Sequence, residues 1–354
     1  MTHLNDLKDF THEKLKNYLS GCGEKPFRAS QMMQWVFQKE AGSISQMTNL
    51  SKAFRDKLEK SFEIGTFHCL HRQTSSDGTE KFLFELKDKK TIESVYIPSE
   101  APSNRKTLCI STQVGCRMGC RFCLTARQGL TRNLTPSEIV SQVLEVQKIL
   151  GLRMTNIVMM GMGEPFDNYE NVVDAIDILQ SPWAFNISQR KITVSTVGLI
   201  PQVVQFGKDS QVNLAISLNA SNDDVRTRIM PVNKTYSIDA LLESCRSYPL
   251  KKNRRLTFEY VLLGGVNDSQ THAKELAEKI KGIRCKVNLI PFNEHPMGPY
   301  RRPKDEDVLE FQKYLVDRNV TAIVRKSRGR DILAACGQLS SKQSQAISAG
   351  NGCA

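Results

Sequence analysis

The sequence has no apolar run close to the roughly 18 residues that cross a bilayer, and its N-terminus has no signal-peptide core. These absences predict a soluble, cytoplasmic protein. Acidic residues are scarce as well, since 37 Asp and Glu stand against 49 Lys and Arg, a net charge of +12. The excess of cations favours a polyanionic partner such as RNA, DNA or an acidic membrane surface, although it also serves general solubility.

The ten cysteines are clustered rather than evenly spaced. In a chain of 354 residues, this pattern favours a reducing compartment over a framework of disulfides. A chain of this length can bury a large core, with room for one large α/β domain and a smaller unit.

Residues 1–65 are predicted to form a small helical domain. Apolar residues recur at helical spacing from Ala29 to Phe37, and a second run with the same spacing extends from Phe54 to Phe62. Lysines and arginines occupy the other sides of the second run. A helical unit with basic faces can bind a phosphate backbone, but an ordinary solvated helix has the same composition.

Residues 66–101 contain two alternating runs, KFLFEL (81–86) and IESVYI (92–97), with the turn sequence KDKK between them. This alternation predicts a β-hairpin that leads into the rest of the chain. Glu93 lies in the second run, and the pattern alone would make it an exposed strand residue.

From residue 102 to 331, apolar strands alternate with helical stretches, which predicts a parallel sheet. A partial six-stranded (β/α) barrel of the TIM type fits the count, and a doubly wound sheet is the alternative. The best-marked helix begins at Thr135 with a capping box completed by Glu138, and it ends at Gly151. The predicted strands are Thr107–Thr112, Asn156–Met160, Lys191–Thr196, Val212–Ser217, Leu256–Leu262 and Lys286–Pro291.

Most of the polar and glycine-rich segments within these residues come at the end of a predicted strand. In a (β/α) barrel, ligands bind at the carboxyl ends of the strands, so this coincidence predicts one shared site. The segments concerned are residues 116–123, Gly161–Glu164, Ser195, Ser217–Asn219 and Asn293.

Cys116, Cys120 and Cys123 have the spacing C-x3-C-x2-C. Thiolates this close in sequence hold a zinc ion or an iron–sulfur cluster. No fourth Cys or His follows within the next turn or two. A four-iron cluster on three cysteines keeps one iron open, which suits a small chelator with an amine and a carboxylate, such as the methionine end of S-adenosylmethionine (SAM). Structural zinc and inert core cysteines are the alternatives. Glu164 offers a carboxylate to an ammonium group, although a lone Gly-x-Gly is more often only a tight turn.

Cys336 has four cations within eleven residues of it, in the segment RKSRGRDILAAC. An electropositive setting lowers the pKa of a thiol and makes the thiolate more available as a nucleophile. The alternative is an inert cysteine beside a basic loop. Residues 332–354 are assigned to a C-terminal loop that ends in a mobile tail.

The three-cysteine motif, with Phe122 before its last cysteine, resembles the signature of the radical SAM superfamily. Within that superfamily the chain is most similar to the bacterial dual-specificity RNA adenine C2 methyltransferases, which act on 23S ribosomal RNA and certain transfer RNAs. The likeness covers about residues 92 to 339 and is weaker in the helix KPFRASQMMQWVFQK. The matching segments are IESVYIP, LCISTQVGCRMGCRFCLTARQG, GMGEPFDN, STVG, NLAISL, YVLLGGVND, NLIPFN and VRKSRGRDILAACGQL.

The resemblance implies a role for each candidate residue. One SAM would methylate Cys336, a second would be cleaved reductively at the cluster, and the resulting radical would take a hydrogen from the methylated thiol so that the methylene adds to adenine. Glu93 would accept the C2 proton, and Cys109 would form the disulfide with Cys336 that releases the base. The implied cluster ligands are Cys116, Cys120 and Cys123, and the implied SAM contacts are Gly163, Glu164, Ser195, Ser217, Leu218, Asn219 and Asn293.

Asn219 departs from the family pattern, which usually has histidine at this place. A contact through the histidine ring would be lost here, whereas a contact through the backbone would be kept.

The implied enzyme uses one 4Fe–4S cluster and two SAM molecules per turnover. Its implied partners are 23S rRNA, tRNA and an electron donor such as flavodoxin, and it would be a monomer. A sister enzyme that methylates C8 of the same rRNA adenine is one alternative, although GMGEPFDN is closer to the C2 enzymes. A zinc-stabilised RNA-binding protein is the other, and it leaves Cys109 and Cys336 unexplained.

Overall fold

A ten-stranded sheet forms the centre of the protein, in a computed structural model that describes residues 4–100, 102–295 and 298–340. Seven neighbouring strands in this described part are parallel to one another. In order across the sheet they are β6 (Lys106–Cys109), β9 (Asn156–Met159), β10 (Ile192–Thr196), β11 (Asn213–Ser217), β12 (Leu256–Leu262), β13 (Cys285–Pro291) and β14 (Ala322–Val324).

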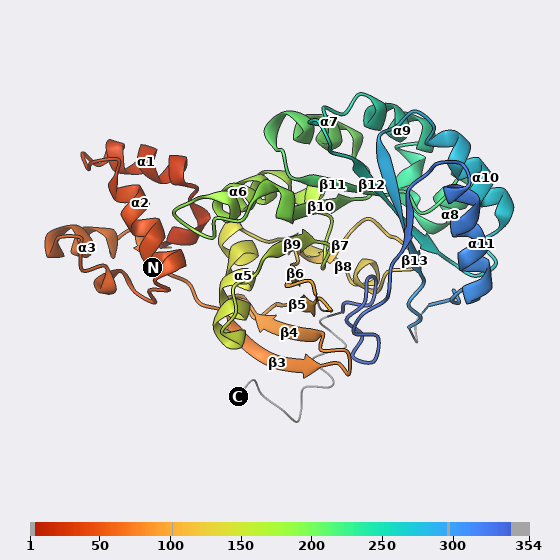
Figure 1. The fold of residues 1–354 in the computed structure, drawn as a ribbon. Helices are drawn as coiled ribbons and strands as arrows, with labels where there is room; N and C mark the ends of the chain where they lie inside the picture. The colour runs from red at the N-terminus through yellow and green to blue at the C-terminus, as the bar shows by residue number, and fades with distance from the viewer. Residues whose placement is uncertain (1–3, 101, 296–297, 341–354) are drawn as a thin grey trace.

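The parallel strands follow one another across the sheet in chain order, and most crossover helices lie around its outer side (Figure 1). A doubly wound sheet would reverse its strand order at a switch point and carry helices on both faces. The sheet is therefore a partial barrel, as predicted, and the doubly wound alternative is wrong. The helices are α5 (Pro136–Leu150), α6 (Tyr169–Gln180), α7 (Ile200–Asp209), α8 (Asp223–Ile229), α9 (Ile238–Arg246), α10 (Gln270–Lys279) and α11 (Asp305–Val316).

The six predicted barrel strands are all confirmed, although the first is shorter than predicted and ends at Cys109. The seventh strand, β14, was not predicted, because three residues are too few to show a periodic pattern. Among the described helices, none combines the length and the apolar character needed to cross a membrane.

The predicted hairpin is confirmed as β4 (Glu80–Glu85) and β5 (Thr91–Pro98), and β3 (His68–Thr74) adds a further antiparallel strand at the sheet edge. β5 also pairs with β6, so the hairpin continues the barrel sheet. Glu93 on β5 is completely buried, and its expected exposure is wrong. The C-terminal segment covers it, since the backbone N–H of Ser340 donates to Glu93 Oε2 at 2.7 Å.

The N-terminal residues form short helices and a two-stranded ladder. The predicted helix from Ala29 to Phe37 is confirmed, and its second half is a π-helix. Phe62 lies in a strand and not in the second predicted helix, because it packs there against the ring of Tyr18 with ring centres 4.9 Å apart. The elements are β1 (Asn5–Asp6), α1 (His12–Gly21), α2 (Arg28–Met33), η2 (Gln34–Gln38), α3 (Lys52–Leu58) and β2 (Phe62–Glu63).

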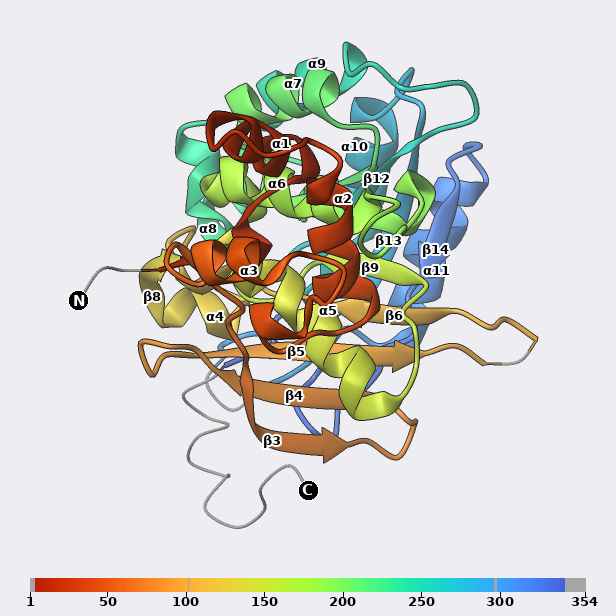
Figure 2. The same cartoon turned by 90° about the vertical axis from the view of Figure 1, so that its left-hand side faces the viewer.

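These helices lie beside α5 and α6, at one side of the barrel (Figures 1 and 2). Asp9 Oδ1 accepts a hydrogen bond of 2.7 Å from the backbone N–H of Ser137, at the start of α5. Gln38 Nε2 donates to the carbonyl of Pro182 at 2.9 Å, just after α6. Specific hydrogen bonds therefore fix the N-terminal helices on the barrel.

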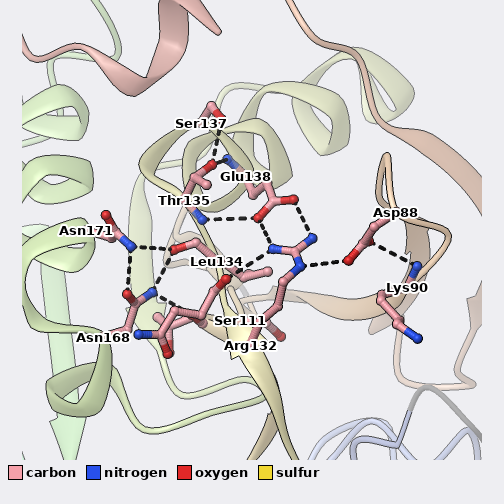
Figure 3. A network of polar contacts seen from close by, with 12 residues as sticks. Asp88, Lys90, Ser111, Arg132, Leu134, Thr135, Ser137, Glu138, Asn168 and Asn171 are labelled. Carbon is pink, nitrogen blue, oxygen red and sulfur yellow. Dashed lines mark hydrogen bonds and ion pairs between the residues drawn. The ribbon is translucent and has the colours of Figure 1, made fainter. Parts of the chain in front are cut away.

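A second small sheet holds the cysteine segment. β7 (Gln113–Cys116) and β8 (Gly129–Asn133) are antiparallel, and the short helix α4 (Leu124–Arg127) lies between them. Figure 3 shows Arg132 of β8 between Asp88 and Glu138, with Arg132 Nε 2.8 Å from Asp88 Oδ2. Glu138 also closes the predicted capping box with Thr135 at the start of α5. The cysteine segment is thus tied to both the β4–β5 turn and the first crossover helix.

Candidate functional site

A cavity lies at the carboxyl ends of the parallel strands. Its empty volume is about 950 Å³, including open space at its mouth. Most of the residues proposed from the sequence line it, although they come from segments far apart in the chain. These are Cys116, Cys120, Cys123, Gly163, Glu164, Ser195, Ser217, Asn219, Asn293 and Cys336. Leu218, Cys109 and Glu93 are not among the lining residues.

The three cysteines of the motif enter the cavity from one loop. Cys116 ends β7, and Cys123 immediately precedes α4. All three are free thiols, and burial raises the pKa of Cys116 to about 12 and that of Cys120 well above its usual value. In the described residues no three acidic, histidine or cysteine side chains converge on one point as ligands of a single ion. A cluster that gives each thiolate its own iron does not require such convergence.

Gly115 sets the direction of this loop. Its φ of +78° lies in the left-handed region, and a Cβ atom built on it would lie 1.8 Å from the carbonyl oxygen of Gly129 on β8. Any side chain here would force β7 and β8 apart. The residue before Cys116 must therefore be glycine for the hairpin to bring that thiol into the cavity.

Glu164 is a buried carboxylate in the wall of the cavity. Its Oε1 accepts from the backbone N–H of Phe166 at 3.0 Å, and its Oε2 accepts from that of Val197 at 2.9 Å, after β10. Burial raises the pKa of Glu164 to about 7, against these hydrogen bonds, which lower it. Gly163 before it has a φ of +104°, and a Cβ atom there would lie 2.6 Å from Gln113 Cβ. The glycine lets the Glu164 turn pack against β7.

Asn293, Ser195 and Ser217 supply neutral polar groups at the ends of β13, β10 and β11. Asn293 is 2% exposed, and no hydrogen-bond partner for its Oδ1 is found among the described residues. Ser195 Oγ and Ser217 Oγ lie 3.4 Å apart. An orphaned buried acceptor in a cavity wall is costly unless a ligand satisfies it, so these residues fit a polar ligand such as the nucleoside part of SAM.

Asn219 stands in the left-handed region, with a φ of 59°, where asparagine is favoured among non-glycine residues. Its Oδ1 accepts from the backbone N–H of Val261 at 2.8 Å, and its carbonyl accepts from Asn267 Nδ2 at 2.7 Å. The side chain that replaces the family's usual histidine is thus bound to β12. Leu218 beside it is fully buried away from the cavity.

Cys336 reaches the cavity from the C-terminal loop, and it is exposed there. Although Cys336 as a residue is exposed, its sulfur lies among packed groups, and the resulting desolvation raises the pKa of the thiol to about 11. The nearby Arg325 only partly opposes this, so the lowered pKa expected from the sequence is not found. The loop is held against the cysteine segment, since the carbonyl of Gly337 accepts from the backbone N–H of Leu124 at 2.8 Å. Thr125 Oγ1 donates to the carbonyl of Leu339 at 2.8 Å.

Cys109 and Glu93 are buried and do not line the cavity. Cys109 ends β6 and is buried, and both burial and the neighbouring Cys336 raise the pKa of its thiol. Glu93 forms an ion pair with Lys81 at 3.2 Å as well as its bond with Ser340. The structure therefore brings Cys109 near Cys336 and places Glu93 under the loop that carries Cys336.

Sequence reasoning missed two charged residues of the site. Glu259 on β12 lines the cavity, and Asn288 Nδ2 donates to its Oε1 at 2.9 Å. Arg226 on α8 is completely buried beneath the strand ends. A carboxylate inside the apolar run LTFEYVL was the available signal for Glu259, whereas nothing in the sequence set Arg226 apart from the other cations.

A partial barrel with three cysteines at the mouth, beside a carboxylate and an unpaired amide, defines a radical SAM protein. Two family models match this chain, the radical SAM superfamily over residues 110–277 and the ribosomal RNA large subunit methyltransferase N-terminal domain over residues 5–64. The fold is similar to the crystal structure of a radical SAM methyltransferase from Sphaerobacter thermophilus. The TM-score is 0.87 at 43% identity, covering 95% of this chain and 99% of that one.

Curated relatives are similar over nearly the whole chain. The dual-specificity RNA methyltransferase RlmN of Syntrophus aciditrophicus is 51% identical, covering 96% of this chain and 98% of the relative. The dual-specificity RNA methyltransferase RlmN of Geotalea uraniireducens is 49% identical, covering 97% of this chain and 98% of the relative. The chain belongs to the family of dual-specificity RNA methyltransferases RlmN. It is a radical SAM methyltransferase with a 4Fe–4S cluster and SAM as cofactors, and the zinc-stabilised binding protein is thereby ruled out.

Proposed function

We propose that the protein methylates C2 of a specific adenine in 23S rRNA and of an adenine beside the anticodon in certain tRNAs, through S-methylation of Cys336. One observation carries this proposal. The Cys336 thiol, on a C-terminal loop, shares a cavity with the three cysteines that would bind the cluster, more than 200 residues earlier in the chain. A cysteine in that place has access to both SAM and the reducing centre.

The residues of the cavity fit the two cofactors. Cys116, Cys120 and Cys123 would hold the cluster and leave one iron open. Glu164 would bind the ammonium group of SAM, and the orphaned Oδ1 of Asn293 would accept from its nucleoside part. The other contacts proposed for SAM are Gly163, Ser195, Ser217, Asn219 and, through its backbone, Leu218. When bound, the cofactors supply a methyl group and, by one-electron reduction, a carbon-centred abstractor of hydrogen.

Two thiols and one carboxylate of this chain would complete the reaction. Cys336 would accept the methyl group and carry it to the adenine ring. Cys109 would then attack the sulfur of Cys336, so that one disulfide forms as the bond between Cys336 and the methylene carbon on the base breaks, and that carbon takes up a proton to become the methyl group. Glu93 would take the C2 proton, and for this the Ser340 backbone that now binds its carboxylate has to move away. Release of the C-terminal loop and access to the base are thereby coupled.

RNA recognition would be shared between parts of the chain. We assign residues 1–65 to an accessory RNA-binding domain, 66–101 to the strands that carry Glu93, 102–331 to the radical SAM core, and 332–354 to the loop of Cys336. The last part is described only up to residue 340. The net charge of +12 supports a polyanionic substrate.

The electron donor would be a small acidic protein such as flavodoxin. Arg121 is exposed on the cluster loop, and Arg117 is 59% exposed beside it, where it pairs with Asp167, so this loop presents two cations to an acidic partner. Complementary charge speeds the encounter of such partners. We further propose a monomer, and a cytoplasmic location, where ribosomal and transfer RNA are found.

Cys336→Ala tests the proposal. Anaerobic turnover of the wild type on unmodified 23S rRNA should yield 2-methyladenosine in the digested product, and the variant should yield none. Cys22→Ala, at a half-buried thiol in the N-terminal helices, is the matched control and should retain activity. A methyl group on C8 would identify the sister activity instead, and normal methylation by Cys336→Ala would refute the covalent role.

A further inference from the structure

Arg226 lies completely buried beneath the strand ends that line the cavity. Its Nε donates to the carbonyl of Leu218 at 3.0 Å, and its Nη2 donates to that of Val197 at 2.7 Å and to that of Ser217 at 3.3 Å. Val197 follows β10, and Ser217 ends β11. One guanidinium therefore joins the two strand ends that carry Ser195 and Ser217, both proposed SAM contacts.

The rest of the guanidinium is bound by the segment after α8. Its Nη1 donates to Asn233 Oδ1 at 3.0 Å and to the carbonyl of Tyr236 at 3.2 Å. Asn233 Nδ2 in turn donates to Asp223 Oδ1 at 2.8 Å, so this carboxylate is linked to Arg226 only through an amide. Within the described part of the chain, every hydrogen-bond acceptor of Arg226 is a neutral oxygen.

A buried cation without a carboxylate in contact is unfavourable, because burial removes its hydration and no anion replaces it. Burial accordingly lowers the pKa of Arg226 to about 10. Cys120, in its thiolate form, opposes this effect most strongly, and Asp223 comes second.

The cysteine loop packs on the same segment that Arg226 organises. The backbone N–H of Arg121 donates to the carbonyl of Ile229, the last residue of α8, at 2.9 Å. On the other side of Cys120, a Cβ atom at Gly119 would lie 3.6 Å from Pro231 Cγ. The neighbours of Cys120 on both sides thus contact the end of α8 and the segment that follows it.

We propose that Arg226 is a positioning residue that locks the SAM-binding ends of β10 and β11 together and serves as the counter-cation of the cluster at Cys120. The inference rests on the cluster of the proposed function but not on its RNA chemistry. Each thiolate ligand carries a negative charge and reduction adds another, so a buried cation alongside favours the reduced cluster. The planar fork of arginine, with five donors, can bind several strand-end carbonyls at once, whereas lysine cannot.

Two substitutions separate the charge of Arg226 from the clamp, meaning its hydrogen bonds to the ends of β10 and β11. Arg226→Met removes both the charge and the hydrogen bonds, and Arg226→Lys keeps the charge and loses most of the donors. Arg254→Met is the control, because Arg254 is a half-buried arginine just before β12, at the opposite ends of the strands. The reconstituted proteins would be compared without RNA, by redox titration of the cluster followed by EPR and by equilibrium binding of SAM.

Arg226→Met should lower the equilibrium constant for cluster reduction about tenfold, a shift of about 59 mV to lower potential for one electron, and should weaken SAM binding about tenfold. Arg226→Lys should weaken SAM binding but keep the potential, and Arg254→Met should change neither.

A wild-type potential in Arg226→Met with full iron content would overturn the counter-cation role. Should that variant not fold, Arg226→Lys decides: unchanged SAM affinity contradicts the clamp, and a lowered potential contradicts the charge role. An unexpected RNA product would refute the proposed function, but it would not affect the test of Arg226, because the cluster potential and the SAM affinity are measured without RNA.

Discussion

Cys336 faces a cavity, yet its surroundings raise the pKa of its thiol to about 11. A thiol with this pKa is neutral near pH 7 and is a weak nucleophile. A cation placed beside it lowers the pKa, and the sulfonium of SAM is such a cation. At the scale of the residue, the proposed function would therefore use a neutral thiol that becomes nucleophilic only when SAM binds beside it.

Cys109→Ala should trap the covalent protein–RNA adduct. Cys109 lies near Cys336, and its thiol is the one proposed to attack Cys336 and free the base. After anaerobic turnover, a denaturing gel should show RNA that migrates with the variant protein and disappears after nuclease treatment. Cys245→Ala, at another buried cysteine, should give free RNA. Recovery of only free, normally methylated RNA from Cys109→Ala would contradict this role.

Glu164 should make the cluster-free protein less stable as the pH rises. Its pKa is raised to about 7 by burial, from an ordinary value of 4.5. Its protonated form therefore favours folding, a contribution that is complete below about pH 4.5 and is lost as the pH rises through 7. Urea unfolding should show a loss of about 1–3 kcal/mol between pH 5 and pH 7.5 that is mostly absent in Glu164→Gln.

Glu243→Gln is the matched control for this pH dependence, because Glu243 is 73% exposed on α9. The free energy of unfolding of Glu243→Gln should depend on pH as that of the wild type does. If Glu164→Gln loses stability with pH as steeply as the wild type does, another buried group is responsible.

At the scale of the element, α5 connects the cysteine segment to the barrel wall. Arg132 bridges from β8 to Glu138, with Nη1 2.7 Å from Oε2, and the same Glu138 caps the helix (Figure 3). The side chain of Glu138 therefore contacts both the start of α5 and the β7–β8 hairpin. This element was predictable, because a capping box is a local pattern of four residues, whereas its link to Asp88 was not.

Thr135→Ala should reduce the free energy of unfolding by about 1 kcal/mol, the usual cost of losing an N-cap side chain. Thr135 Oγ1 accepts from the backbone N–H of Glu138, and the alanine cannot replace that bond. Chemical denaturation of the cluster-free protein measures the change. The exposed Thr235→Ala should stay within about 0.5 kcal/mol of the wild type. Equal stabilities of the two variants would show that the cap contributes little.

At the scale of the whole molecule, the net positive charge suits a large RNA substrate. The excess of cations is spread over the chain, and the N-terminal helices are fixed beside the barrel by hydrogen bonds (Figure 2). Near the loop of Cys336, Lys326 is 75% exposed and shares the carboxylate of Glu100 with Arg328. A phosphate backbone that approaches the cavity can replace this carboxylate.

Neutralising Arg325 and Lys326 together, as Arg325→Gln and Lys326→Gln, should weaken RNA binding and flatten its salt dependence. Each lost phosphate contact lowers the slope of log K against log salt by about 0.7 to 0.9. Filter binding of tRNA across a series of salt concentrations measures the slope. Lys313→Gln, at a 75% exposed residue of α11, should leave it unchanged. An unchanged slope in the double variant would place the RNA-binding surface elsewhere.

The sequence alone determined the local elements and the chemical inventory of this protein. Cysteine spacing, strand alternation and the Thr135 capping box are patterns of neighbouring residues, so they were readable, as was the sharing of one sheet edge by the polar segments. Short or packing-dependent elements, such as β14 and the strand at Phe62, were not.

Only the tertiary structure decided which charges are buried and against what. Glu93 looked exposed because the segment that covers it at Ser340 is 247 residues away. Arg226 looked like any surface cation, and Cys336 looked like an activated thiol beside four positive charges. In each case desolvation of the charged form outweighed the effect of residues close in sequence, because desolvation depends on segments that meet only when the chain has folded.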